Sequence, residues 1–345
     1  MLAPVTPAVR YFKRDYKMND TELYDYILAS DIFKKWHWFN YHFSLRLLGF
    51  KHPLAESFIE SCILCDQKIP GFAKKMVDDI AALSGNENFE PHYEQLLQKL
   101  AELFIIRQVV TFDWLTEIVI EYEPTTGNSK KNPEIVVKTK EFTVGIEVKA
   151  PALFSHIRVR KSTSLQIVAR SPYGKHIIQE GKTVILPRDN PIKDFLISAD
   201  GKFEQFKIEN PSFLGLLVIV WDDHIYEPIT SLLHPAAGLF TPNSFARDSN
   251  NQPIQFIRLD GVILVRHLHQ LLSSSRDEPL MDGRKHPFDY GIDRQFPPKI
   301  FISTPKGNIV PSVILECFQA KPRNPLMGSE YIPTDFIHWV YKKHS

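Results

Sequence analysis

This sequence has few cysteines, little net charge and no long apolar run. Each of these features argues against certain classes of protein. Three cysteines among 345 residues are too few for a disulfide framework, so we expect a reducing, cytoplasmic location. No run of about 18 apolar residues is present, which argues against a transmembrane helix and a membrane partner. The first residues also lack the basic-then-apolar pattern of a signal peptide.

A formal net charge of +1 gives the chain no overall basic character. Binding to nucleic acid would therefore depend on a local cluster of Lys and Arg, because attraction to phosphate needs concentrated positive charge. Glycine-rich loops of the dinucleotide-binding and Walker types are absent as well. Their absence argues against a nucleotide-driven motor in this chain.

What the sequence does contain is the composition of a globular protein with a substantial core. Hydrophobic residues make up 43% of the chain and charged residues 23%. Apolar residues at three- to four-residue spacing predict helices in residues 20–88, and the polar stretch 84–91 marks a boundary. We therefore predict a helical N-terminal subdomain, residues 1–88, followed by an α/β domain, residues 89–345.

The pattern changes after a helix predicted over residues 91–110. Apolar residues then alternate with polar ones or form short continuous runs, as is typical of half-buried and fully buried strands. Strands are predicted in this way at 116–124, 133–138, 141–151, 214–223, 258–268 and 298–304, with a helix at 191–206. This order of elements predicts an α/β fold, in which helices flank a mixed sheet.

The residues that suggest chemistry lie in two neighbouring predicted strands. Side chains alternate faces along a strand, so Glu147 and Lys149 point to the same side. A short hairpin brings Glu134 beside them. Gly145 shares that side and, having no side chain, is expected to leave open space in front of it. The sequence thus predicts that two carboxylates and one ammonium group converge at a single point.

Two converging carboxylates repel each other unless a cation joins them. Carboxylate oxygens are hard ligands, and Mg²⁺ is usually held by one or two carboxylates together with water and substrate phosphate. Such an ion lowers the pKa of a bound water and offsets charge on phosphoryl oxygens. A neighbouring ammonium group can position the nucleophile or stabilise developing negative charge. Glu134, Glu147 and Lys149 therefore predict hydrolysis of a phosphodiester that depends on Mg²⁺ or Mn²⁺.

In these residues the sequence resembles the PD-(D/E)xK phosphodiesterase superfamily, which includes restriction endonucleases and recombination exonucleases. Pro133-Glu134 corresponds to the PD element, with Glu in place of Asp, and Glu147-Val148-Lys149 matches (D/E)xK in full. The predicted order of helix, strand, hairpin, helix and strand also fits. The resemblance implies a restriction-endonuclease-like fold and metal-dependent cleavage of nucleic acid, with DNA favoured over RNA.

The same resemblance implies roles for individual residues. Glu134 and Glu147 would ligate Mg²⁺ or Mn²⁺ together with the backbone carbonyl of Val148, and Lys149 would orient or activate the attacking water. Many members carry a further glutamate on the helix before the sheet, and Glu102 is the candidate here, acting on the metal through a water. Nucleases that cut both strands often dimerise, so a homodimer is considered as well.

Substrate contacts are predicted on the elements that follow the motif. Lys202 and Gln205 are about one turn apart on the predicted helix 191–206 and share a face. Arg158 and Arg160 are two residues apart and are expected to project from one side of an extended segment toward the phosphate backbone. A solvated surface charge is the alternative interpretation of each of these side chains.

Two further features of the sequence have more than one interpretation. The aromatic run from Trp36 to Phe43 could stack on nucleic-acid bases, although aromatic residues at helical spacing favour core packing. Asp222 and Asp223 end a buried strand, where α/β sheets often place polar site residues.

Two rival functions stand beside the nuclease. One is a non-catalytic module that keeps the nuclease fold and binds nucleic acid or protein. The other is an acid-pair hydrolase such as a glycosidase, which needs two carboxylates about 5–10 Å apart across an open cleft and no essential lysine. The close spacing of Glu147 and Lys149 argues against the second rival.

Overall fold

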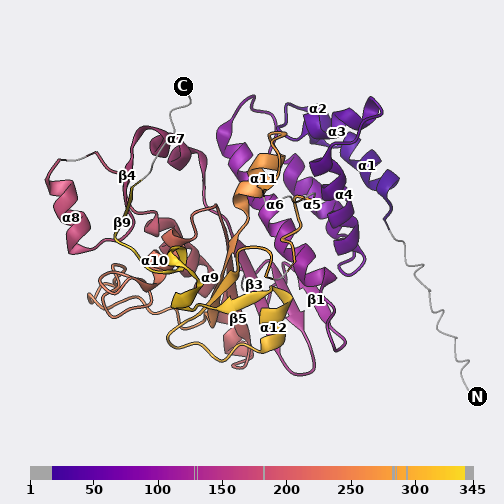
Figure 1. The fold of residues 1–345 in the computed structure, drawn as a ribbon. Helices are drawn as coiled ribbons and strands as arrows, with labels where there is room; N and C mark the ends of the chain where they lie inside the picture. Colours follow the sequence, from indigo (N-terminus) through magenta and orange to yellow (C-terminus); the bar gives the residue numbers. More distant parts are fainter. Residues whose placement is uncertain are drawn as a thin grey trace, which may run out of the picture.

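Helices from the amino-terminal part of the chain stand beside a central β-sheet, and later helices cover the opposite face of that sheet (Figure 1). This computed structural model describes residues 18–338, apart from 128, 130, 182, 282, 283, 285 and 293. Residues 1–17 of the predicted helical subdomain and 339–345 of the predicted α/β domain lie outside the described part.

Some of the helices described ahead of the first strand begin at a residue whose side chain caps them. They are α1 (Asp20–Leu28), α2 (Asp31–Lys34), α3 (Asn40–Leu47), α4 (Pro53–Asp66), α5 (Phe72–Ala81) and α6 (Glu90–Thr111). Asn19 and Glu22 form a capping box at the start of α1, and the Ser30 side chain caps α2. Gly71, ahead of α5, has a φ of 90°, a left-handed conformation that glycine adopts at little steric cost. The helical character predicted for residues 20–88 is confirmed.

Seven strands in the described part of the chain form one mixed sheet in the order β1-β2-β3-β5-β6-β7-β8. They are β1 (Val119–Tyr122), β2 (Ile135–Lys138), β3 (Thr143–Lys149), β5 (Leu214–Trp221), β6 (Gly261–Arg266), β7 (Lys299–Ser303) and β8 (Ala320–Pro322). The first three strands are antiparallel neighbours, whereas β5 lies parallel to β3, and β6 lies parallel to β5. The predicted α/β class and mixed sheet are confirmed.

The connection from β3 to its parallel neighbour β5 is long and contains three helices. They are α7 (Phe154–Ser162), α8 (Pro172–Gln179) and α9 (Asp189–Glu209). Parallel neighbours need such a crossover, and α9 packs against both strands.

The other described elements lie at the sheet's periphery. They are β4 (Leu165–Ile167), α10 (Tyr226–Leu233), α11 (Leu268–Ser274), α12 (Ser312–Cys317), the 3₁₀ turns η2 (Pro325–Met327) and η3 (Ser329–Tyr331), and β9 (Phe336–His338), which pairs with β4. No described helix combines the length and the apolar character needed to cross a membrane.

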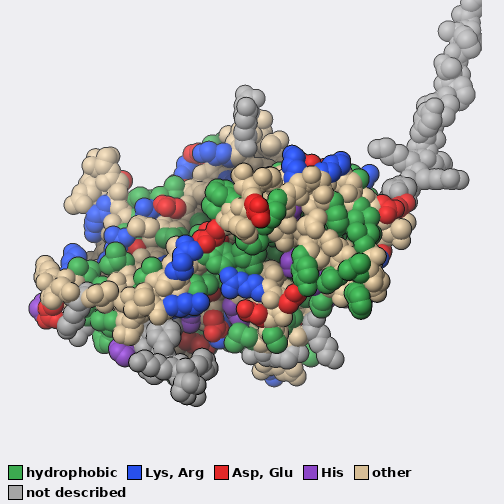
Figure 2. Space-filling view, turned by 90° about the horizontal axis from the view of Figure 1, so that it is seen from above, with side chains coloured by type: hydrophobic (Ala, Val, Ile, Leu, Met, Phe, Trp, Pro, Cys, Tyr) green, Lys and Arg blue, Asp and Glu red, His purple; other side chains and the backbone are tan. Residues whose placement is uncertain are grey.

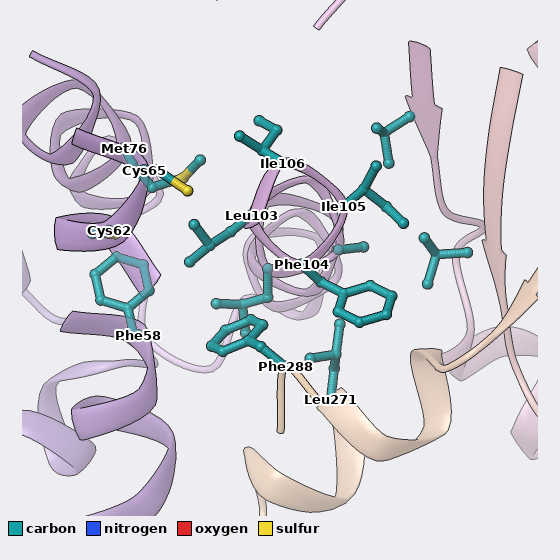
Figure 3. Close-up of a cluster of buried hydrophobic side chains, with 14 of the residues drawn as sticks. Phe58, Cys62, Cys65, Met76, Leu103, Phe104, Ile105, Ile106, Leu271 and Phe288 are labelled. Atoms are coloured by element: carbon teal, nitrogen blue, oxygen red, sulfur yellow. The ribbon is translucent and has the colours of Figure 1, made fainter. Parts of the chain in front are cut away.

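Helix α6 has no exposed residue between Leu96 and Val110, and it joins the amino-terminal helices to the sheet. Four consecutive residues of α6 point in different directions and are each at most 1% exposed: Leu103, Phe104, Ile105 and Ile106. Figure 3 shows these side chains meeting α4 and α5 on one side and α11 on another. A helix that is apolar all round is stable in water only when other elements cover it completely.

Alternate side chains of β3 divide between the two faces of the sheet, as predicted. The apolar set, Val144, Ile146 and Val148, joins the core around α6. The other set lies on the face that α9 covers. The prediction of open space in front of Gly145 is wrong, because aromatic rings fill that space. A Cβ atom at Gly145 would lie 2.4 Å from Cζ of Phe213 and 3.0 Å from Cε1 of Phe203.

We expect Gly145→Ala to lower the free energy of unfolding by about 1–3 kcal/mol, because the new methyl group would overpack the Phe213 ring. Gly201→Ala in α9 is the control. There the nearest atom is the movable Nζ of Lys131 at 3.3 Å, and alanine favours a helix by about 1 kcal/mol over glycine. Urea denaturation measures both variants. Equal effects would contradict the packing described for Gly145.

The buried side chain of Lys299 is expected to make the stability of the protein depend on pH. Its side chain is fully buried, with Nζ 3.3 Å from Oε1 of Gln108 and 4.1 Å from the centre of the Tyr290 ring. Burial lowers the pKa of this amine from 10.5 to about 7. Between these pH values the unfolded chain holds a proton that the folded protein lacks, so the contribution of Lys299 to stability rises with pH.

Lys299→Met should therefore stabilise the protein most below about pH 7, and the gain should shrink toward pH 10.5. The difference in unfolding free energy between variant and wild type, measured by urea denaturation at about pH 6 and about pH 9.5, checks this expectation. A difference that does not change with pH would show that Lys299 keeps its proton when buried.

Candidate active site

The β2–β3 hairpin brings the two predicted carboxylates together. Ile135 pairs with Ile146 in the antiparallel register, so Glu134, just before β2, stands opposite Glu147. Both side chains are buried, with Glu147 0% and Glu134 6% exposed. Their predicted convergence is confirmed. Burying two carboxylates side by side is costly unless positive charge lies close to them.

Two lysines supply that charge. Lys149 lies two residues beyond Glu147 on the same face of β3, and its Nζ is 2.6 Å from Oε1 of Glu147. Lys202 reaches the same carboxylate from α9, with Nζ 2.8 Å from Oε1 and 2.9 Å from Oε2. The Lys202 ammonium is also 3.7 Å from Oε1 of Glu134. A single cationic group therefore bridges the two buried carboxylates.

Helix α6 adds a second acid and lysine pair to this neighbourhood. Lys99 and Glu102 are three residues apart and their charged atoms are 2.6 Å apart. Asp79 of α5 lies 3.7 Å from the same ammonium group. The Glu102 carboxylate is close enough to influence the ionisation of Glu134. The structure thus brings the predicted residue Glu102 to the site, held by Lys99.

The ionisation of these groups reflects their crowding. Burial, helped by the charges of Glu102 and Glu147, raises the pKa of Glu134 to about 8, although Lys202 and Lys99 oppose the change. Burial also raises the pKa of Glu102 against the pull of Lys99. Burial lowers the pKa of Lys202, but Glu147 and Glu134 more than offset this, and the net shift is upward. Three carboxylates and three ammonium groups share this one site.

The donor set fits a small site for a hard divalent cation. Among the described residues, no group of three or more His, Cys, Asp or Glu side chains is placed to hold a metal ion. The convergent donors are the carboxylates of Glu134 and Glu147, a number that suits Mg²⁺ or Mn²⁺ completed by water and phosphate. The Lys202 ammonium already occupies a cation position between them. Val148 has its side chain in the apolar core, so it offers its backbone alone.

The other predicted substrate contacts are not assembled with these groups. Gln205 donates to Oε1 of Glu209 at 3.0 Å instead of joining Lys202. The prediction that Arg158 and Arg160 lie in an extended segment is wrong, because both residues lie in α7. Residues two apart on a helix point in different directions.

The two arginines accordingly have different neighbours. Arg158 forms an ion pair with Glu90 at the start of α6. Arg160 adds to burial in lowering the pKa of His224 to about 4.

Asp222 and Asp223 belong to a separate polar cluster at the end of β5. Arg188 donates to Asp222 at 3.0 Å and to Glu227 at 2.9 Å, and Asp223 pairs with Arg266. Burial alone would raise the pKa of Asp222, yet Arg188 holds it at about 2. Each aspartate is matched by an arginine, so this cluster serves to tie the loop after β5 to its surroundings.

Sequence reasoning missed Lys99, although a signal for it was present. The spacing of Lys99 and Glu102 is that of neighbours on a helix surface, and both were placed on the predicted helix. The sequence could not show that this surface patch would face the β2–β3 hairpin. That orientation follows from the way α6 is buried between other elements.

Comparison with protein-family models, with curated proteins and with solved structures gives no match for this chain. The site is therefore characterised by its geometry alone.

A matched pair of lysines on α9 tests the bridging role. Lys202→Met leaves Glu147 with Lys149, whereas Lys207→Met removes the ammonium group that lies 2.8 Å from the fully buried Asp260. Removing one partner of a buried ion pair costs about 3–5 kcal/mol. We expect a loss of this order for Lys207→Met and about 1–2 kcal/mol for Lys202→Met, measured by urea denaturation. The reverse order would contradict the shared neutralisation of Glu147.

Proposed function

We propose that this protein is a divalent-metal-dependent phosphodiesterase that cleaves nucleic acid, with a restriction-endonuclease-like fold. The observation that carries the proposal is the position of Glu134 directly opposite Glu147, with Lys149 on the same strand face. The order of elements adds support: α6, the meander β1-β2-β3, the crossover helix α9 and then parallel β5. This order is the one that the resemblance to PD-(D/E)xK enzymes implies.

The proposed roles follow from where each group lies. Glu134 and Glu147 hold Mg²⁺ or Mn²⁺, which supplies Lewis-acid stabilisation of a phosphate and a more acidic water. Lys149, about one-quarter exposed, faces solvent enough to meet the scissile phosphate and to orient the attacking water. Lys202 keeps the two carboxylates from repelling each other in the metal-free protein and then turns to the substrate phosphate. On the side of α6, the ammonium group of Lys99 neutralises the carboxylate of Glu102.

One observation favours the rival non-catalytic module. Three lysines already neutralise three glutamates, so a metal ion must compete with the Lys202 ammonium group. Calorimetric titration of Mn²⁺ into wild type and into Glu147→Gln separates the two ideas. Heat of binding in the wild type alone supports the metal site. Absence of binding in both proteins would favour the non-catalytic module.

The glycosidase alternative fits the site poorly. Its two carboxylates need an open gap that admits a sugar and a water. Here the ammonium group of Lys202 fills the space between Glu134 and Glu147, at 3.7 Å and 2.8 Å from their oxygens. Three lysines around the acids instead suit a substrate that carries negative charge.

Cleavage assays on plasmid DNA, single-stranded DNA and RNA with Mg²⁺ or Mn²⁺ test the activity itself. Glu147→Gln and Lys149→Met should each lower the cleavage rate by about 100-fold or more, as is usual when a group that stabilises the transition state is removed. Chelation with EDTA should abolish cleavage.

Glu121→Gln is the matched control for these assays. Glu121 also pairs with a lysine, Lys138, on a neighbouring strand at 2.6 Å, but in an exposed position away from the converged acids. Its activity should equal that of the wild type. Full activity in a Glu147→Ala/Lys149→Ala double variant would refute the site.

A further inference from the structure

A pocket lined by aromatic side chains lies at the amino-terminal end of α6. Its volume is about 290 Å³, and it is lined by Trp38, Asn88, Glu90, Tyr93, Phe154, Ser275 and Arg276. Phe39 and Phe43 of the aromatic run around Trp36 belong to the core, since both are 0% exposed. Trp38 differs, because its ring is half-buried and forms part of the pocket wall.

Three of these rings form a continuous stack. Trp38 stacks on Tyr93 with ring centres 4.8 Å apart, and Tyr93 stacks on Phe154 at 5.1 Å. The indole N–H of Trp38 donates to the carbonyl of Phe89 at 3.2 Å, which fixes the outer ring of the stack. Tyr93 is covered on both faces by its neighbours and Phe154 is covered by Tyr93 and Arg276, so the half-buried Trp38 is the ring that can stack on a base, as aromatic side chains do in single-stranded nucleic-acid binders.

The charge around the pocket favours a ligand that carries phosphate. The guanidinium group of Arg276 lies 5.1 Å from the centre of the Phe154 ring, and its side chain is exposed. No acidic partner of Arg276 is found in the described part of the chain, whereas Glu90 is neutralised by Arg158. Figure 2 looks at the molecule from above Figure 1 and shows Lys and Arg side chains near the middle of this face, beside hydrophobic ones and with Asp and Glu side chains among them.

The pocket and the candidate active site lie on different sides of α6. Tyr93 and Glu102 are nine residues apart on this helix, which is about 14 Å along its axis and about two and a half turns, so their side chains point in opposite directions. Phe154 follows Lys149 by five residues along the chain. Glu94 of α6 holds this stretch by accepting from the backbone N–H groups of Leu153 and Phe154 at 2.9 and 2.8 Å.

From this arrangement we propose that the Trp38–Tyr93–Phe154 pocket binds an unpaired base of a single-stranded nucleic acid. The proposal rests on the proposed nuclease function and names the form of its substrate. Arg276 contacts the phosphate next to the stacked base. Duplex bases are not accommodated, because their faces are covered by their neighbours within the helix.

The test is binding of a fluorescein-labelled oligothymidylate of about 12 nucleotides, followed by anisotropy in EDTA so that no cleavage occurs. The wild type is expected to bind it. Trp38→Leu should weaken binding roughly tenfold, within the range contributed by one base–aromatic stack. Arg276→Ala should weaken it several-fold and should flatten the dependence of affinity on salt.

Trp114→Leu is the matched control, because Trp114 is also half-buried and donates its indole N–H to a backbone carbonyl, that of Val109 at 3.0 Å. It lies beyond the opposite end of α6, and its replacement should leave binding unchanged. Equal binding by Trp38→Leu and Trp114→Leu overturns the proposal. So does tighter binding of the matched duplex than of the single strand by the wild type.

Arg276→Ala is a second variant that leaves Trp38 in place, and it removes an exposed side chain that has no ion pair in the described chain. Wild-type binding by this variant also counts against the pocket. The outcome is separable from the nuclease proposal. If Glu147→Gln binds the oligonucleotide normally but Trp38→Leu does not, the pocket stands whether or not cleavage occurs. If Trp38→Leu binds and cleaves like wild type, the nuclease stands and the pocket proposal fails.

Discussion

The burial of α6 between Leu96 and Val110 is the constraint on which the rest of this structure depends. Because its apolar residues point in every direction, the helix must be covered by the amino-terminal helices on one side and by the sheet on the other. Polar residues of α6 contact the neighbouring parts of the structure. Tyr93 lines the aromatic pocket, Glu94 holds the segment after β3, and Lys99 and Glu102 enter the charged site. One packing requirement thereby positions groups that lie about 14 Å apart.

Two buried ion pairs on the same helix, α9, differ in how their carboxylates are held. Asp260 is saturated: it accepts from Lys207 and from the backbone N–H groups of Gly215 and Asn308. Glu147, in contrast, is surrounded by movable lysine side chains, and its neighbour Glu134 has a pKa raised to about 8 by burial and like charge. Carboxylates held by flexible ammonium groups can exchange those partners for another cation, whereas a carboxylate fixed by backbone amides cannot do so without local unfolding.

Much of the fold and the centre of the site followed from local pattern. The period of two in β3 placed Glu147 and Lys149 on one face, and the helical spacing before the sheet placed α6 correctly. Prediction failed where neighbours distant in sequence decide the outcome. The space before Gly145 is filled by Phe203 and Phe213, which belong to a different part of the chain. Arg158 lies in a helix whose weak apolar pattern gave no periodic signal.

The sequence by itself determined the types of residue at the site, their alternation along β3 and the class of the fold, because these depend on interactions between residues a few positions apart. Only the tertiary structure decided that Lys202 would bridge Glu134 and Glu147 from α9, and that Trp38 would stack on Tyr93 and Phe154. These contacts join residues tens of positions or more apart in sequence. They form because burying α6 and both faces of the sheet leaves the chain one compact way to remove its apolar surface from water.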